Sequence, residues 1–189
     1  ANWLFRMLKS DPSETTPSVY PRLFPLHFIL EDDGFQANQK QRHDDGDQVA
    51  SITDSFPPFP PCQWLSAEKL DGDGLYLLED GGEMLVWVGR NYPQDRLKEV
   101  FGVDTVDQLD ARRSMLPPNL PNERNKRMNA FINSMRKARS GYLRMRILKR
   151  NDAMETLFYN RLIEDRSVAG MSYVEFLCHV HRLIQNKFT

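Results

Sequence analysis

The sequence is short of cysteine, of long apolar runs and of an excess of charge of either sign. Two cysteines, Cys62 and Cys178, stand far apart and form no C-x-x-C motif, which argues against a disulfide framework and fits a reducing, cytosolic compartment. No apolar stretch approaches the roughly 20 residues that a membrane-spanning helix needs. The formal net charge of −1 gives the molecule as a whole no electrostatic preference for nucleic acid or for an anionic membrane.

Sequence motifs that mark catalysis are missing as well. The chain has no G-x-S-x-G, no glycine-rich phosphate loop and no H-E-x-x-H. Glu164, Asp165 and Arg166 stand in a row, but a solvated turn or an ion pair at a helix end explains such a run better than catalysis does. We therefore expect a protein that is not an enzyme.

The first part of the chain changes character twice. Residues 1–9 have the apolar spacing of the last turns of a helix, which Pro12 and Pro17 are expected to end because proline lacks a backbone donor. Residues 19–30 are apolar with two prolines and suit an edge strand or an extended connector. Residues 31–55 carry seven acidic residues against two basic ones, with few large apolar side chains, so we expect a mobile acidic loop.

Strand signals follow a stiff, proline-rich lead-in, FPPFPP, that ends at residue 61. Two short apolar runs, 75–78 and 84–88, flank the turn signal Asp80-Gly81-Gly82 and predict an antiparallel hairpin. Residues 143–147 alternate apolar and basic side chains, which predicts a further strand with one face inward.

Four helices are predicted in the same part of the chain. The first covers residues 93–101, and the second begins after its cap Asn122 and ends by Gly141. The third follows Asp152, and the last is the C-terminal stretch that begins at the capping box of Ser172 and Glu175. The order of strands and helices predicts an α+β layer, with a mixed or antiparallel sheet covered by helices. The positions expected to be buried are Met128, Phe131, Ile132 and Met135 on the second helix, Met154, Leu157, Phe158 and Leu162 on the third, Tyr173, Phe176, Leu177, Val180 and Ile184 on the last, and the aromatic residues Trp64 and Trp87.

Three separated segments carry a resemblance to known families. Residues 65–89, LSAEKLDGDGLYLLEDGGEMLVWVG, resemble the opening of a gelsolin-like domain. Residues 162–180, with IEDR followed by MSYVEFLCHV, resemble the end of the cargo-selecting subunit of the COPII inner coat, and residues 20–27 resemble its connector. The resemblance implies a gelsolin-like central mixed sheet flanked by helices, as a fragment of a larger multidomain protein. Residues 1–30 would then be the end of a helical domain and a connector, 31–60 the acidic loop and Pro-rich lead-in, and 61–189 the gelsolin-like domain with C-terminal helices.

The function that the resemblance implies is protein interaction and scaffolding within a cargo adaptor for transport from the endoplasmic reticulum to the Golgi. The full-length chain would pair with the sister inner-coat subunit and a small GTPase, bind cargo sorting signals, and sit peripherally at exit sites on the cytoplasmic face. This stretch would hold no cofactor, whereas a zinc finger upstream would hold structural zinc. The cargo itself is left open, because the known cargo pockets of the family lie largely in other domains. An actin-binding gelsolin-type module is the alternative.

Two parts of the sequence resemble metal sites, and neither is expected to bind a metal ion. Gelsolin domains often bind calcium through a Gly-Asp pair at the first core strand, and here that pair reads Gly74-Leu75, which replaces a carboxylate by an apolar side chain. Cys178, His179 and His181 cluster near the end of the chain, but helical spacing lets only Cys178 and His181 share a face. Structural zinc needs four ligands, so this cluster is too small.

Basic residues crowd one stretch of the chain. Residues 122–150 hold ten Lys or Arg against one acid, which predicts either the solvated face of an amphipathic helix and strand or a docking surface. The acidic partner would be a neighbouring coat domain or the loop at 31–55, whereas nucleic acid is not expected because the chain lacks an RNA-binding signature. The residues predicted to form this basic docking face are Arg124, Arg127, Arg136, Arg139, Arg144 and Arg146.

Overall fold

A computed structural model of the chain describes residues 12–31, 61–109, 118–139, 141–148, 154–166 and 170–188. The helix predicted at 1–9, the acidic loop beyond residue 31, most of the proline-rich lead-in and the predicted cap Asp152 lie outside the described residues. No helix in the described ranges has both the length and the apolar character needed to cross a membrane.

Four strands form one mixed sheet in the order β1-β2-β3-β4. β1 (Arg22–Pro25) pairs antiparallel with β2 (Leu75–Glu79), and β2 pairs antiparallel with β3 (Glu83–Val88). β4 (Arg144–Leu148) pairs parallel with β3 at the other edge. The predicted hairpin, the edge strand and the later strand are thus confirmed, and the sheet is mixed as an α+β gelsolin-like fold requires.

The hairpin turn is fixed by its own side chain. Asp80 Oδ1 accepts hydrogen bonds from the backbone N–H groups of Gly82 at 3.0 Å and Glu83 at 2.9 Å. Gly81, which follows Asp80 in the turn, has a φ of 84°, a conformation that glycine adopts without a steric cost. The turn therefore sets the register that places Leu77 opposite Val86 in the core.

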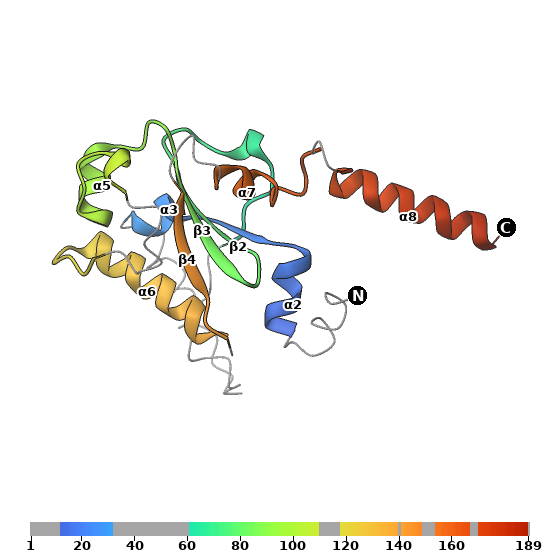
Figure 1. The fold of residues 1–189 in the computed structure, drawn as a ribbon, viewed down its shortest axis with the longest axis horizontal. Helices are drawn as coiled ribbons and strands as arrows, with labels where there is room; N and C mark the ends of the chain where they lie inside the picture. The colour runs from blue at the N-terminus through green and yellow to red at the C-terminus, as the bar shows by residue number, and fades with distance from the viewer. Residues whose placement is uncertain are drawn as a thin grey trace, which may run out of the picture.

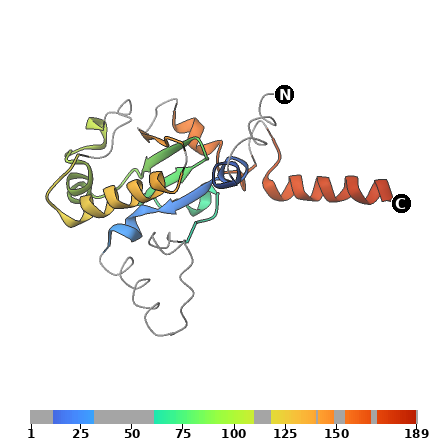
Figure 2. The ribbon, with the colours of Figure 1, turned by 90° about the horizontal axis from the view of Figure 1, so that it is seen from below.

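Helices cover both faces of the sheet, which explains why β2 and β3 are continuous apolar runs. One face packs on α3 (Leu26–Leu30), α5 (Gln94–Phe101) and α6 (Glu123–Lys137), and the other face packs on α7 (Glu155–Tyr159) (Figures 1 and 2). The two cores share no side chain, because successive residues of a strand point to opposite faces. Short 3₁₀ turns at Ala67–Lys69 and Val106–Gln108 complete the connections.

Helix α5 and the start of α6 lie where the sequence predicts, whereas α6 ends at Lys137, before the predicted stop at Gly141. Asn122 caps α6 by accepting a hydrogen bond from the Asn125 N–H at 2.9 Å, and Gly102 ends α5 with a φ of 72°. The predicted stripe on α6 is buried in full: Met128, Phe131, Ile132 and Met135.

Two helix predictions need correction near the ends of the described body. α2 (Pro12–Val19) is helical where Pro12 and Pro17 were expected to break the chain. Pro12 occupies the first helical position, where an N–H has no partner to lose, and Pro17 removes one hydrogen bond without ending the helix. α7 is shorter than expected, although Phe158 and Leu162 are buried and Met154 packs against them as predicted.

The last helix, α8 (Tyr173–Phe188), runs away from the sheet rather than over it (Figures 1 and 2). Its capping box is confirmed: the Ser172 N–H donates to Glu175 Oε2 at 2.9 Å, and the Glu175 N–H donates to Ser172 Oγ at 3.3 Å. The burial predicted for its apolar stripe is wrong, since Phe176 is 52 % exposed and Ile184 51 %. No other described element lies along this face of the helix. The predicted burial of the aromatic side chains is confirmed for Trp87, Phe131 and Phe158, and it is wrong for Trp64 and Phe176, which are exposed.

Candidate functional site

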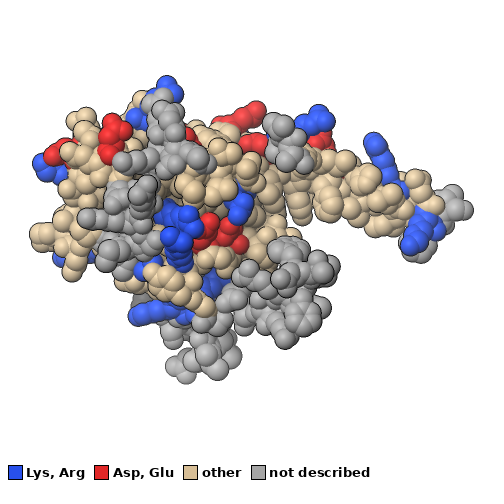
Figure 3. All heavy atoms as spheres, in the orientation of Figure 1, with Lys and Arg blue, Asp and Glu red and all other residues tan. Residues whose placement is uncertain are grey.

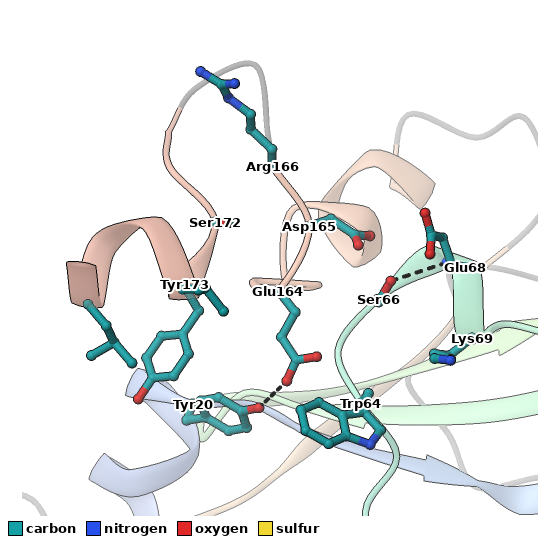
Figure 4. Close-up of a pocket in the computed structure, with 12 residues that line it drawn as sticks. Tyr20, Trp64, Ser66, Glu68, Lys69, Glu164, Asp165, Arg166, Ser172 and Tyr173 are labelled. Carbon is teal, nitrogen blue, oxygen red and sulfur yellow. Dashed lines mark hydrogen bonds between the residues drawn. The ribbon is translucent and has the colours of Figure 1, made fainter. Parts of the chain in front are cut away.

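A pocket of about 670 Å³ opens where α8 leaves the body (Figure 4). Its walls come from four parts of the chain: the end of α2, the segment before β2, the turn after α7, and the first turns of α8. The residues that line it are Tyr20, Trp64, Ser66, Glu68, Lys69, Glu164, Asp165, Arg166, Ser172, Tyr173, Val174 and Leu177.

Backbone and carboxylate hydrogen bonds hold the floor of the pocket in place. The Glu164 N–H donates to the carbonyl oxygen of Leu65 at 3.1 Å, and Asp165 Oδ2 accepts from the Ala67 N–H at 2.7 Å. The Tyr173 N–H donates to the carbonyl oxygen of Ile163 at 2.8 Å, which ties the start of α8 to the same turn. The pocket is therefore built on fixed backbone, whereas the rest of α8 extends beyond it.

Aromatic rings flank the carboxylate of Glu164, one of three acidic side chains that line the pocket. The Tyr20 hydroxyl donates a hydrogen bond to Glu164 Oε1, and the rings of Tyr20 and Tyr173 meet edge to face, with centroids 5.3 Å apart. Figure 4 shows the Glu164 carboxylate between Tyr20 and Trp64, with the Tyr173 ring on the Tyr20 side. Trp64 is 69 % exposed, so one wall of the pocket presents a large ring to solvent.

The electrostatics of the pocket keep Tyr20 a donor. Burial, and then the hydrogen bond to the Glu164 carboxylate, raise the pKa of Tyr20 to about 12. At neutral pH its phenol is therefore protonated and Glu164 Oε1 is engaged. At the rim, the backbone hydrogen bond at Ser172 lowers the pKa of Glu175, and Arg166 Nη1 lies 3.8 Å from Glu175 Oε1.

Some residues of this pocket stand out in the sequence, but the sequence does not show that they come together. The run of Glu164, Asp165 and Arg166 lies in a turn with an exposed ion pair, as the interpretation against catalysis expected. Trp64 was missed, because a large aromatic residue was assigned to the core. The signal that could have found it is its neighbourhood, since Gln63 and Ser66 on either side make a weak strand and follow a proline-rich run.

The cysteine and histidines weighed as zinc ligands all lie on exposed positions of α8: Cys178, His179 and His181. Among the residues that the structure describes, no three or more His, Cys, Asp or Glu side chains gather as a metal site would require.

The six arginines predicted as a basic docking face are divided between two environments. The Arg139 side chain is buried and pairs with Glu79, which also binds Arg22 with its other oxygen at 2.7 Å. Arg146 pairs with Glu83 at 2.8 Å, and Arg124 pairs with Glu99 at 3.3 Å. Figure 3 shows basic side chains beside acidic ones on the face it presents.

The remaining arginines of that set lie nearer to solvent. Arg136 on α6 donates to the Leu143 carbonyl at 3.2 Å and stacks over the Tyr142 ring at 5.0 Å. Arg127 is half-buried on α6, and Arg144 is exposed on β4. The structure thus gives several of these guanidinium groups acidic partners of their own, while the docking role of the six stays a prediction.

Comparisons with known proteins agree with this architecture. A family model described as "Gelsolin repeat" matches residues 58–132, the segment that contains the hairpin, α5 and much of α6. Together with the mixed sheet and its two helical layers, the match defines a gelsolin-like domain.

Similarity to individual proteins shows which family of gelsolin-like proteins the chain belongs to. Human protein transport protein Sec24C is 35 % identical over 176 residues, 93 % of this chain and 14 % of that protein. SEC24 C of Arabidopsis thaliana is 32 % identical over 90 % of this chain and 14 % of its own length. The crystal structure of the human COPII-coat protein Sec24c matches with a TM-score of 0.69 and 33 % identity, over 95 % of this chain and 20 % of that one. The chain is a gelsolin-like region of the Sec24 type, and it spans about one seventh of the length of these curated relatives.

Proposed function

We propose that this chain is a non-catalytic interaction and scaffolding region of a COPII cargo adaptor that supports transport from the endoplasmic reticulum to the Golgi. One observation carries the proposal: sequence and fold match human Sec24C together over more than nine tenths of the chain. Identity of 33 % with a TM-score of 0.69 is agreement in fold and in sequence at once, which chance similarity of a common fold does not give.

The exposed face of α8 supports an interaction role. A domain that only folds on itself buries its large apolar side chains, and this one leaves Phe176, Leu177 and Ile184 about half exposed on one helix. In the proposed adaptor, residues 1–30 would connect a helical domain to the gelsolin-like domain at 61–189. The sister inner-coat subunit and cargo signals would engage the full-length chain, peripherally at exit sites, and structural zinc would belong to an upstream zinc finger.

The actin-binding alternative is not favoured. The relatives that match nearly the whole chain are Sec24 proteins. The strand position where gelsolin domains carry a calcium-binding carboxylate is Leu75, and its side chain is fully buried in the core.

A chimera tests the proposal. The matching region of human Sec24C is replaced by residues 1–189, and the chimera is expressed in cells depleted of Sec24C, with export of a Sec24C-dependent cargo as the readout. We expect export to be restored. A chimera that carries Met128→Asp, which places a charge in the core, is the inactive control. A chimera that accumulates as a folded protein, binds the sister subunit and still fails to restore export would sink the proposal.

A further inference from the structure

We infer that the pocket at the foot of α8 is a binding site for an arginine or lysine side chain of a partner peptide, with apolar neighbours of that side chain resting on α8. The inference goes beyond the proposed function and does not depend on it, because it follows from the chemistry of the pocket alone. Three features carry it: a carboxylate without a counter-ion among the described residues, aromatic walls and an apolar rim.

The carboxylate is that of Glu164. Its Oε1 accepts a hydrogen bond from the Tyr20 hydroxyl, and within the described part of the chain its Oε2 has no hydrogen-bond donor and no cation beside it. Two basic side chains line the pocket, Lys69 and Arg166, and neither forms an ion pair with Glu164, since Arg166 lies by Glu175 instead. A partly buried carboxylate without a counter-ion gains most from an incoming cation, since a charge-assisted hydrogen bond is stronger than a neutral one.

The walls suit an organic cation better than a metal ion. Trp64 stands on one side of the Glu164 carboxylate, and Tyr20 with Tyr173 stands on the other (Figure 4). A guanidinium or ammonium group between such rings is attracted by their π faces, most strongly by tryptophan. A planar guanidinium can stack on Trp64 while it donates to Glu164, which favours arginine over lysine.

The apolar rim of the pocket can bind the apolar residues that flank the basic side chain of a peptide. Val174 and Leu177 line the pocket on the α8 side, and Leu177 is 46 % exposed. Phe176, Leu183 and Ile184 continue this apolar surface along the helix. A partner segment with one basic residue and apolar residues beside it would pair its charge with Glu164 and bury its apolar side chains on α8.

The test uses two acetylated and amidated tetrapeptides, Leu-Arg-Ala-Leu and the same peptide with citrulline in place of arginine. Citrulline keeps the shape of arginine and removes its charge. Binding to isotope-labelled 1–189 is followed by NMR at the Trp64 indole N–H and the Leu177 methyl groups. We expect both signals to shift with the arginine peptide, at a dissociation constant of about millimolar strength, and about tenfold weaker binding of the citrulline peptide. Equal affinity for the two peptides, or shifts confined to another surface, would overturn the inference.

Variants separate the pocket from general charge attraction. Glu164→Gln keeps the acceptor for Tyr20 and removes the negative charge, so we expect about tenfold weaker binding of the arginine peptide. Glu123→Gln, an exposed carboxylate at the start of α6, is the matched control and should leave binding unchanged. If Glu164→Gln alters the fold, Trp64→Ala carries the test, because that side chain is largely exposed; Tyr142→Ala is its control.

The outcomes distinguish the occupants. Loss of binding in Glu164→Gln and Trp64→Ala, but not in the controls, supports a peptide site. A dimer of 1–189 in light scattering that Glu164→Gln dissociates would show that a second copy fills the pocket, and would overturn the inference of a separate partner.

Discussion

Helices α6 and α8 carry nearly the same apolar pattern, yet the structure buries one and exposes the other. The α6 stripe of Met128, Phe131, Ile132 and Met135 is buried against the sheet and α3, whereas Phe176, Leu177 and Ile184 of α8 face solvent. Both helices are capped by side chains, by Asn122 and by the box of Ser172 and Glu175. A helical pattern therefore shows which face of a helix is apolar but not what covers that face.

The two regions also differ in how they satisfy charge. In the body, Glu79 is buried completely and holds Arg22 and Arg139. At the foot of α8, Glu164 has a phenol as its partner. The charge of Glu79 is therefore neutralised by arginines of the same domain, while that of Glu164 is available to a ligand.

The largest expected effect is the loss of the buried carboxylate. Glu79→Ala would leave the Arg139 guanidinium buried beside an empty space, and we expect the free energy of unfolding to fall by about 3–5 kcal/mol in urea denaturation. The double variant Glu79→Leu with Arg139→Leu removes both charges and should recover a large part of that loss. A double variant as unstable as Glu79→Ala would contradict this account of the pair.

A matched pair of isoleucines compares the two helices directly. Ile132→Ala removes a fully buried side chain of α6, so we expect a loss of about 2–5 kcal/mol in the free energy of unfolding. Ile184→Ala removes a half-exposed side chain of α8, and its effect should stay within about 0.5 kcal/mol. Equal losses for the two variants would mean that α8 packs its apolar face in solution.

Much of this fold could be predicted from the sequence because it rests on local rules. The hairpin follows from Asp80-Gly81-Gly82 between two apolar runs, and the ends of α5 and α6 follow from Gly102 and Asn122. The errors share one physical cause, which is that tertiary context decided the outcome. Pro17 is tolerated inside α2, and the faces of α8 and Trp64 are exposed, for reasons that no local pattern contains.

The candidate site was harder to predict than the fold. Glu164 and Tyr20 are 144 positions apart in the sequence, and only the folded chain brings them into hydrogen-bond contact. The basic residues show the reverse case, because the sequence groups them while the structure commits Arg139 and Arg146 to Glu79 and Glu83.

The caps of the two helices give a smaller test of the same comparison. Asn122→Ala should lower the free energy of unfolding by about 1 kcal/mol, because α6 is part of the cooperative body. Ser172→Ala removes the acceptor for the Glu175 N–H and should instead speed amide hydrogen exchange in the first turn of α8. We expect the unfolding midpoint of Ser172→Ala to stay near that of the unmodified chain. A midpoint that falls as far as in Asn122→Ala would show that α8 unfolds together with the body.

The smallest expected effect is a pH dependence at the contact between α2 and the pocket. Burial and the Glu164 carboxylate raise the pKa of Tyr20 to about 12 from its ordinary value of 10.0, so the folded state holds this proton more tightly than the unfolded chain does. The stability that this contributes is fully present below pH 10 and is lost as the pH rises toward 12. Tyr20→Phe should therefore flatten the fall of stability across this range. The remaining fall belongs to Tyr76, whose pKa burial raises, and to Tyr92, whose pKa burial raises to about 12. Urea denaturation at several pH values measures the slope. An unchanged slope in Tyr20→Phe would mean that the hydroxyl is not bound to Glu164 in solution, and Glu164 would then have both oxygens available to a cation.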